Sequence, residues 1–158
     1  MEKIASFNID HTKLRPGVYV SRKDRVGLET VTTFDLRFTI PNRMPAMEPA
    51  AMHAIEHLAA TYLRNDPGWR EAVIYFGPMG CRTGFYLIMK GSLQPGSIVP
   101  LLVRCFKFIS KYEGPIPGAS AKECGNYVEM NLPMARYWAG RYFDVLDFID
   151  EDRMCYPQ

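Results

Sequence analysis

The stretch that decides the fold is Glu48–Arg64, EPAAMHAIEHLAATYLR. It is rich in alanine, carries a proline at its second position and is followed by Asn-Asp-Pro-Gly, a combination that predicts one helix with defined ends. At about 100° per residue, one side of that helix collects a set of apolar side chains: Ala51, Ile55, Leu58, Ala59 and Tyr62. We therefore expect this helix to pack on a sheet through one face and to leave the opposite face free.

Runs of β-branched and aromatic residues lie on both sides of this helix. Two precede it and two follow it: Val18–Arg22, Thr30–Ile40, Glu71–Met79 and Gly84–Lys90. Two more helices are predicted further along the chain, over Ser97–Tyr112 and, behind the capping residue Asn131, over Leu132–Phe148. Paired strands separated by single helices predict an α+β fold, in which helices cover an antiparallel β-sheet (an α/β sandwich), as a single domain over residues 1–158.

The composition narrows the class of protein. The 158 residues carry 19 Lys+Arg and 17 Asp+Glu, a formal net charge of +2, which is too small for the basic face of a nucleic-acid binder. The N-terminal sequence lacks the apolar run of a signal peptide, and the most apolar stretch, Ser97–Ser110, is interrupted by charges and a proline. We therefore expect a soluble, cytoplasmic protein with no membrane or nucleic-acid partner, whose four cysteines are free thiols.

The predicted helix also carries a His-x-x-Glu-His motif, formed by His53, Glu56 and His57. His57 lies about 40° and Glu56 about 60° from His53 around the helix, so the three polar heads share the face opposite the apolar one. Two imidazoles at this spacing can bind one metal ion. The competing interpretation is a solvated helix face, but two of the chain's three histidines stand in this motif, whereas solvated faces more commonly carry Lys and Glu pairs.

A catalytic metal usually takes three protein ligands and keeps an open position, so a third ligand is expected elsewhere. Cys81 and Cys124 are both candidates, because each lies in a glycine-containing loop where a side chain can face a cavity. Cys105 lies on the apolar face of a predicted helix and Cys155 lies close to the end of the chain. We expect these last two to have structural or incidental roles.

Two other functions are compatible with the motif alone. One is a small H-x-x-E-H metallopeptidase or amidohydrolase, with Glu56 as general base and Glu123 or Glu129 as the third ligand. The inverted zinc peptidases surround that motif with a much larger body than 158 residues can form. The other is a non-catalytic module with a structural metal.

Several segments, taken together with this motif, resemble the S-ribosylhomocysteine lyase family. In chain order they are Ser6-Phe7, Asp10-His11-Thr12, Phe34-Asp-Leu-Arg-Phe38, His53-Ala-Ile-Glu-His57, Pro78-Met-Gly-Cys-Arg-Thr-Gly-Phe-Tyr86 and Glu123-Cys-Gly125. The similarity covers most of the chain and keeps the family's order. It implies a carbon–sulfur lyase of the activated methyl cycle and methionine metabolism. Such an enzyme cleaves S-ribosylhomocysteine to homocysteine and 4,5-dihydroxy-2,3-pentanedione, the precursor of the quorum-sensing signal autoinducer-2.

The resemblance also implies a metal centre and a set of substrate contacts. It assigns one divalent metal per subunit, natively Fe²⁺ with Zn²⁺ or Co²⁺ also accepted. The implied metal ligands are His53, His57 and Cys124, and the implied contacts with the ribosyl part of the substrate are Ser6, His11 and Arg37.

Proton transfer is implied for Cys81, as a thiolate, and for Glu56, as general acid and base. A thiolate at neutral pH requires that the pKa of Cys81 lie below the free value of about 8.5, and we expect Arg82 or the nearby metal to lower it. The resemblance further implies a homodimer with two sites at its interface, each completed by the N-terminal segment of the partner.

Overall fold

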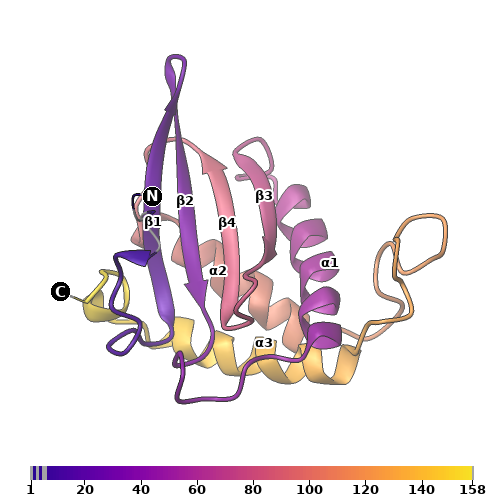
Figure 1. Ribbon diagram of the computed structural model, residues 1–158. Helices are drawn as coiled ribbons and strands as arrows, with labels where there is room; N and C mark the ends of the chain where they lie inside the picture. Colours follow the sequence, from indigo (N-terminus) through magenta and orange to yellow (C-terminus); the bar gives the residue numbers. More distant parts are fainter. Residues whose placement is uncertain (1, 3, 5–6, 158) are drawn as a thin grey trace.

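The computed structural model describes residues 2, 4 and 7–157, which form a four-stranded antiparallel sheet with helices packed on one face (Figure 1). The strands are β1 (Gly17–Val26), β2 (Glu29–Arg37), β3 (Val73–Pro78) and β4 (Gly84–Lys90), in the spatial order β1-β2-β4-β3. The helices are α1 (Pro49–Asn65), α2 (Pro95–Ser110) and α3 (Leu132–Asp147), with a short 3₁₀ helix, η2 (Glu151–Arg153), after them. The predicted α+β fold is confirmed.

The ends of the helices differ from the predicted ones by one or two residues. Asn131 caps α3 as predicted, since its side chain accepts a hydrogen bond from the Met134 N–H at 3.0 Å. Helix α2 begins at Pro95 rather than at Ser97, because Pro95 takes the first helical position, where no N–H is needed. Pro100 therefore lies inside α2.

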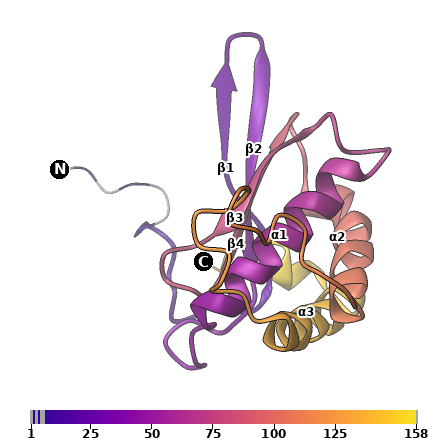
Figure 2. The same ribbon diagram turned by 90° about the vertical axis from the view of Figure 1, so that its right-hand side faces the viewer.

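The β1–β2 hairpin is longer at its tip than the sequence predicts. Its pairing continues to Val26 and Glu29, and the tip projects beyond the other two strands (Figure 2). The outer part of β1 is mostly charged and exposed, so it has no apolar alternation by which sequence could identify it as a strand.

Alternation along β2 separates the two faces of the sheet. Phe34 and Leu36 are fully buried in the core that the sheet shares with the helices. Asp35 and Arg37 alternate with them and so point to the opposite face. In the β2–β4 register Arg37 is paired with Gly84, which places this charged pair beside the turn between β3 and β4.

The connection between α2 and α3, residues 111–131, runs along the outer side of α1 (Figures 1 and 2). It is tied to that helix at its far end, where the Asn131 N–H donates to the Ala50 carbonyl at 2.9 Å. Helix α1 is thereby held between the core and this connection. None of the helices among the described residues has both the length and the apolar character needed to cross a membrane.

Candidate functional site

Helix α1 presents two chemically different faces, as its sequence predicts. Its core-facing side chains are buried: Ala51, Met52, Ala54, Ile55, Leu58, Ala59 and Leu63. His53, Glu56 and His57 are only half-buried, and they line a surface cavity of about 500 Å³ together with Cys124. The helix therefore carries the His-x-x-Glu-His motif to the side that the 111–131 connection covers.

His53, His57 and Cys124 form a group whose candidate ligand atoms all lie within 4.8 Å of one another. The Cys124 Sγ lies 3.3 Å from the His53 Nε2. This group joins the two helix positions to the cysteine loop, and it selects Cys124, rather than Cys81, as the third member of the set.

Hydrogen bonds from the connection fix both imidazole rings. The His53 Nδ1 lies 3.0 Å from the Glu129 carbonyl oxygen, and the His57 Nδ1 lies 2.7 Å from the Pro117 carbonyl oxygen. Since a carbonyl can only accept, each Nδ1 carries a proton, and in the neutral ring the lone pair then lies on Nε2. The two carbonyls thus favour the tautomer in which Nε2 can bind a metal ion.

Gly118 allows the connection to approach His57 this closely. Its φ is +72°, in the left-handed region that favours glycine, and a Cβ there would lie 3.1 Å from the His57 Nδ1. The next turn of the loop places the thiol, because the Cys124 N–H donates to the Ser120 carbonyl at 3.0 Å.

The donor set fits a divalent transition metal. Two neutral imidazole nitrogens and one thiolate are the ligands that Zn²⁺ and Fe²⁺ accept, and three protein ligands leave a position for substrate. Glu56 lines the same cavity, so a carboxylate is available beside the position that the three ligands define.

The carboxylates required by the peptidase alternative have other partners. The Glu129 Oε2 accepts from the Asn126 amide at 2.6 Å, and the Glu123 Oε2 accepts from the Ser120 hydroxyl at 2.6 Å. Glu123 does line the cavity, but neither residue belongs to the convergent group with the histidines. The third donor of that group is a thiol, which does not support a peptidase centre with a glutamate ligand.

A second cluster surrounds Cys81, which is exposed in the turn between β3 and β4. The Arg37 Nη1 lies 3.8 Å from the Cys81 Sγ and also donates to the Thr83 hydroxyl, which lies 3.1 Å from that sulfur. Asp35 holds the other side of the guanidinium: Arg37 donates through Nε to Oδ1 at 3.1 Å and through Nη2 to Oδ2. The thiol thus faces a buried, oriented cation.

This environment lowers the pKa of Cys81. Partial burial acts to raise it, but the hydrogen bonds with Thr83 and the charge and hydrogen bond of Arg37 outweigh burial. Of the two expected causes, Arg82 and the metal, Arg82 does not face the thiol, because its Nη1 donates to the Met47 carbonyl oxygen at 3.5 Å. The cation that faces the thiol comes instead from β2, 44 residues away in sequence.

The turn that carries Cys81 is hydrogen-bonded to the segment that precedes α1. The Met47 N–H donates to the Arg82 carbonyl at 2.9 Å, which fixes the turn that carries Cys81 to the segment directly before the helix. Arg82 has φ +58°, a strained conformation for a residue with a side chain. Cys81 is not one of the described residues that line the cavity beside His53 and His57.

Of the predicted substrate contacts, only Arg37 lies in one of the two clusters among the described residues. The His11 Nδ1 donates to the Ile9 carbonyl oxygen at 2.9 Å, and no hydrogen bond between described residues joins His11 to either cluster. Arg37 lies in the Cys81 cluster, and Ser6 lies outside the described residues.

The remaining two cysteines differ in their surroundings. Cys105 is fully buried in the core, where burial raises the pKa of its thiol, and this agrees with its expected structural role. Cys155 is exposed.

Three residues of the Cys81 cluster have no predicted role: Asp35, Thr83 and Tyr156, whose hydroxyl donates to the Asp35 Oδ2 at 2.9 Å. Asp35 stands two positions before Arg37 in a predicted strand, so a shared face was a usable signal. Tyr156 follows Asp35 by 121 residues, and no local pattern connects them.

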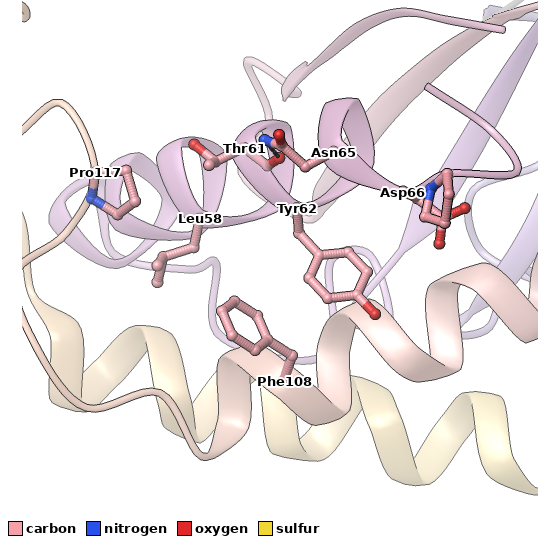
Figure 3. Close-up of a pocket in the computed structure, with 8 residues that line it drawn as sticks. Leu58, Thr61, Tyr62, Asn65, Asp66, Phe108 and Pro117 are labelled. Atoms are coloured by element: carbon pink, nitrogen blue, oxygen red, sulfur yellow. Dashed lines mark hydrogen bonds between the residues drawn. The ribbon is translucent and has the colours of Figure 1, made fainter. Parts of the chain in front are cut away.

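Another cavity, of about 330 Å³, lies between α1 and α2 (Figure 3). Leu58 and Tyr62 of α1 point toward Phe108 of α2, with the Tyr62 and Phe108 ring centroids 5.1 Å apart. Its carboxylate, Asp66, accepts from the Arg104 Nη2 at 2.9 Å. Because this cavity is apolar and its carboxylate is paired, we place the chemistry in the cavity of the histidines.

Comparison with known proteins adds an independent finding. The family model described as S-ribosylhomocysteinase (LuxS) matches residues 4–152. Proteins named S-ribosylhomocysteine lyase are similar over the full length. The protein from Clostridium acetobutylicum is 56% identical over 158 residues, covering 100% of both chains. The one from Clostridium beijerinckii is 58% identical, covering 99% of both. The one from Finegoldia magna is 57% identical, covering 100% of both.

Proposed function

Because the chain belongs to the S-ribosylhomocysteinase (LuxS) family, we propose that it is a metal-dependent S-ribosylhomocysteine lyase acting as a single domain over residues 1–158. Its products are homocysteine and 4,5-dihydroxy-2,3-pentanedione, the autoinducer-2 precursor. The observation that carries this proposal is the convergence of His53, His57 and Cys124 in a cavity that Glu56 also lines. A second thiol, Cys81 in the turn between β3 and β4, has a lowered pKa.

The three convergent side chains are the proposed metal ligands. Fe²⁺ is the proposed native metal, and Zn²⁺ or Co²⁺ would also suit two imidazoles and a thiolate. When bound, the metal supplies a Lewis acid that polarises the carbonyl oxygen of the open-chain sugar. The Pro117 and Glu129 carbonyls keep the two imidazole Nε2 atoms available for this task.

Proton transfer is proposed for Cys81 and Glu56. The reaction moves a carbonyl along the sugar in two isomerisations, each of which removes a proton beside the carbonyl and returns one to the neighbouring carbon. In the last step a proton leaves the carbon between the carbonyl and the sulfur-bearing carbon. The C–S bond then breaks, and the sulfur leaves with the electron pair and takes up a proton. The Cys81 thiolate, held beside Arg37, and the Glu56 carboxylate are the bases and acids for these transfers.

A homodimer is the proposed assembly. No helix among the described residues covers the second face of the sheet, where the side chains of Tyr75, Tyr86 and Ile88 border a shallow cavity of about 270 Å³. We infer that a second copy of the chain covers this face. His11, which lies apart from both clusters within its own chain, and Ser6 would then serve the partner's site.

The cytoplasm is the proposed location. All four cysteines are free, which suits a reducing compartment, and two of them are proposed to act as thiolates.

The proposed activity is tested by incubating anaerobically purified, iron-loaded protein with S-ribosylhomocysteine and measuring free thiol with a disulfide reagent. We expect stoichiometric release of homocysteine. Absence of new thiol with fully metal-loaded protein would overturn the proposal.

A further inference from the structure

Tyr156, which follows the 3₁₀ helix η2, reaches the polar cluster that faces Cys81. Its hydroxyl donates to the Asp35 Oδ2 at 2.9 Å, and its ring stacks on Tyr19 with centroids 4.9 Å apart and planes 6° apart. Burial, together with the charge of Asp35, raises the pKa of Tyr156, so the hydroxyl stays protonated and can only donate to the carboxylate.

The chain around Tyr156 is anchored independently of that hydrogen bond. After α3, the 3₁₀ helix η2 is capped by Asp150, whose Oδ1 accepts from the Arg153 N–H at 3.0 Å. The Arg153 carbonyl approaches β1 so closely that a Cβ at Gly17 would overlap its oxygen. Tyr142 of α3 donates to the Gly17 carbonyl at 2.9 Å. Helix η2 therefore packs against the first residue of β1. This packing holds Tyr156, further along the chain, close to Asp35.

We propose that Tyr156 is a positioning residue for Cys81, which it serves by holding the Asp35–Arg37 pair in the orientation that directs one guanidinium nitrogen at the thiol. Cys81 as a catalytic residue belongs to the function proposed above, and to that extent this inference rests on it. The positioning itself is a property of the fold.

The geometry explains how a distant hydroxyl acts on the thiol. Two of the three guanidinium nitrogens of Arg37 bind the two oxygens of Asp35, which fixes the guanidinium plane. The third nitrogen, Nη1, then faces Thr83 and Cys81. Tyr156 donates to the Asp35 oxygen that also accepts from the Arg37 Nη2. Its hydroxyl therefore offsets part of the negative charge of Asp35, and the positive charge of Arg37 acts more strongly on the thiol.

Among the described residues, the ionisable groups that the structure links to the thiol are Arg37, Asp35, Tyr156 and Tyr86. Arg37 is the cation that lowers the pKa of Cys81. Asp35 and Tyr156 lie behind that cation, and Tyr86 of β4, whose pKa is raised by burial, Asp35 and Cys81, borders it on the next strand. Removing the Tyr156 hydroxyl leaves Asp35 with one donor fewer, and the carboxylate then draws on Arg37 more strongly. The thiolate of Cys81 should become less stable.

The test measures the thiolate directly in the full-length, metal-loaded protein. Cys81 is alkylated with iodoacetamide across a pH series, and its rate is read by mass spectrometry from the tryptic peptide 71–82, in which it is the only cysteine. In Tyr156→Phe we expect the midpoint pH of the alkylation rate to rise and the alkylation rate at pH 7 to fall about threefold. In Tyr156→Ala, which also exposes the ion pair to water, the shift should be larger. The matched control is Tyr137→Phe, at a half-exposed tyrosine on α3, and it should match the wild type.

Turnover of S-ribosylhomocysteine by the same proteins provides the second readout. We expect kcat of Tyr156→Phe to fall with KM unchanged. The acidic limb of the pH profile of kcat should move to higher pH by the same amount as the midpoint pH of alkylation. A midpoint equal to that of the control in Tyr156→Phe overturns the inference, even if Tyr156→Ala does not fold, because the Phe variant keeps the ring and its stack on Tyr19. The two proposals can fail separately. If the alkylation midpoint of Tyr156→Phe is shifted but Cys81→Ala still turns over the substrate, the positioning by Tyr156 is supported and the proposed catalytic role of Cys81 is overturned.

Discussion

The Nη1 of Arg37 lies 3.8 Å from the Sγ of Cys81, although the two residues stand 44 positions apart in sequence. The β2–β4 register creates this proximity, because it pairs Arg37 with Gly84 at the start of the strand that follows the cysteine turn. A strand side chain therefore supplies the charge that a loop cysteine needs. Thr83 of the same turn and Arg37 of the sheet stabilise the thiolate together.

The first prediction concerns the pH dependence of the wild-type protein. Because Arg37 and Thr83 lower the pKa of Cys81, its thiolate should persist below the pH at which a cysteine in a short peptide is half ionised. The rate of alkylation of peptide 71–82 should rise with pH through a midpoint below about 8.5, and turnover should rise through the same midpoint. A midpoint at or above that of a model peptide would contradict the role of Arg37.

The second prediction tests the close approach of β2 and β4. A Cβ at Gly84 would overlap the Leu36 carbonyl oxygen, so Gly84→Ala must separate the strands beside Arg37. We expect a loss of about 1–3 kcal/mol in the free energy of unfolding, measured by denaturant titration. Gly80→Ala is the matched control, because a Cβ there meets nothing within 4 Å. Equal stability of the two variants would contradict this account of the strand contact.

A glycine also provides the third prediction, for the metal centre. In Gly118→Ala the new Cβ meets the His57 imidazole and the backbone is strained at φ +72°, so the Pro117 carbonyl should move away from the His57 Nδ1. Metal affinity, measured by competition with a chelator, should fall by about 10–100-fold. Gly125→Ala, whose Cβ meets nothing within 4 Å, should bind metal as the wild type does. Unchanged affinity in Gly118→Ala would argue against this support of His57.

The fourth prediction tests the composite site of the proposed dimer. His11→Ala and Cys81→Ala should each be inactive alone. If each site combines Cys81 of one copy with His11 of the other, mixed dimers contain one intact site. Refolding the two variants together should then restore about one quarter of the wild-type activity. Sites formed within one chain would give no recovery, and that outcome would remove the proposed role of the partner.

The features of the fold and of the site that depend on local sequence patterns can be predicted from the sequence. The 3.6-residue period of Glu48–Arg64 predicts both faces of α1, and the Asn131 cap and the prolines near the helix starts locate the helices within two residues. The His-x-x-Glu-His spacing identifies a metal-binding face, because one helical turn alone brings those side chains together.

The parts that depend on tertiary contacts could not. From the residues alone, both Cys81 and Cys124 are candidates for the third ligand, since only the fold places residue 124 beside His53. Arg82, one of the two cations that the sequence suggests for Cys81, has a positive φ, and its side chain points to the Met47 carbonyl. The Asp35–Tyr156 hydrogen bond joins residues 121 positions apart, which no periodicity indicates.

The central claim is that two cysteines divide the chemistry, with Cys124 holding the metal and Cys81 moving the proton. Its most direct test measures metal content and S-ribosylhomocysteine turnover on the same anaerobic samples of Cys81→Ala and Cys124→Ala. The account predicts that Cys81→Ala keeps one metal per chain and loses turnover, whereas Cys124→Ala loses both. Loss of the metal from Cys81→Ala, with a metal-loaded Cys124→Ala, would contradict it.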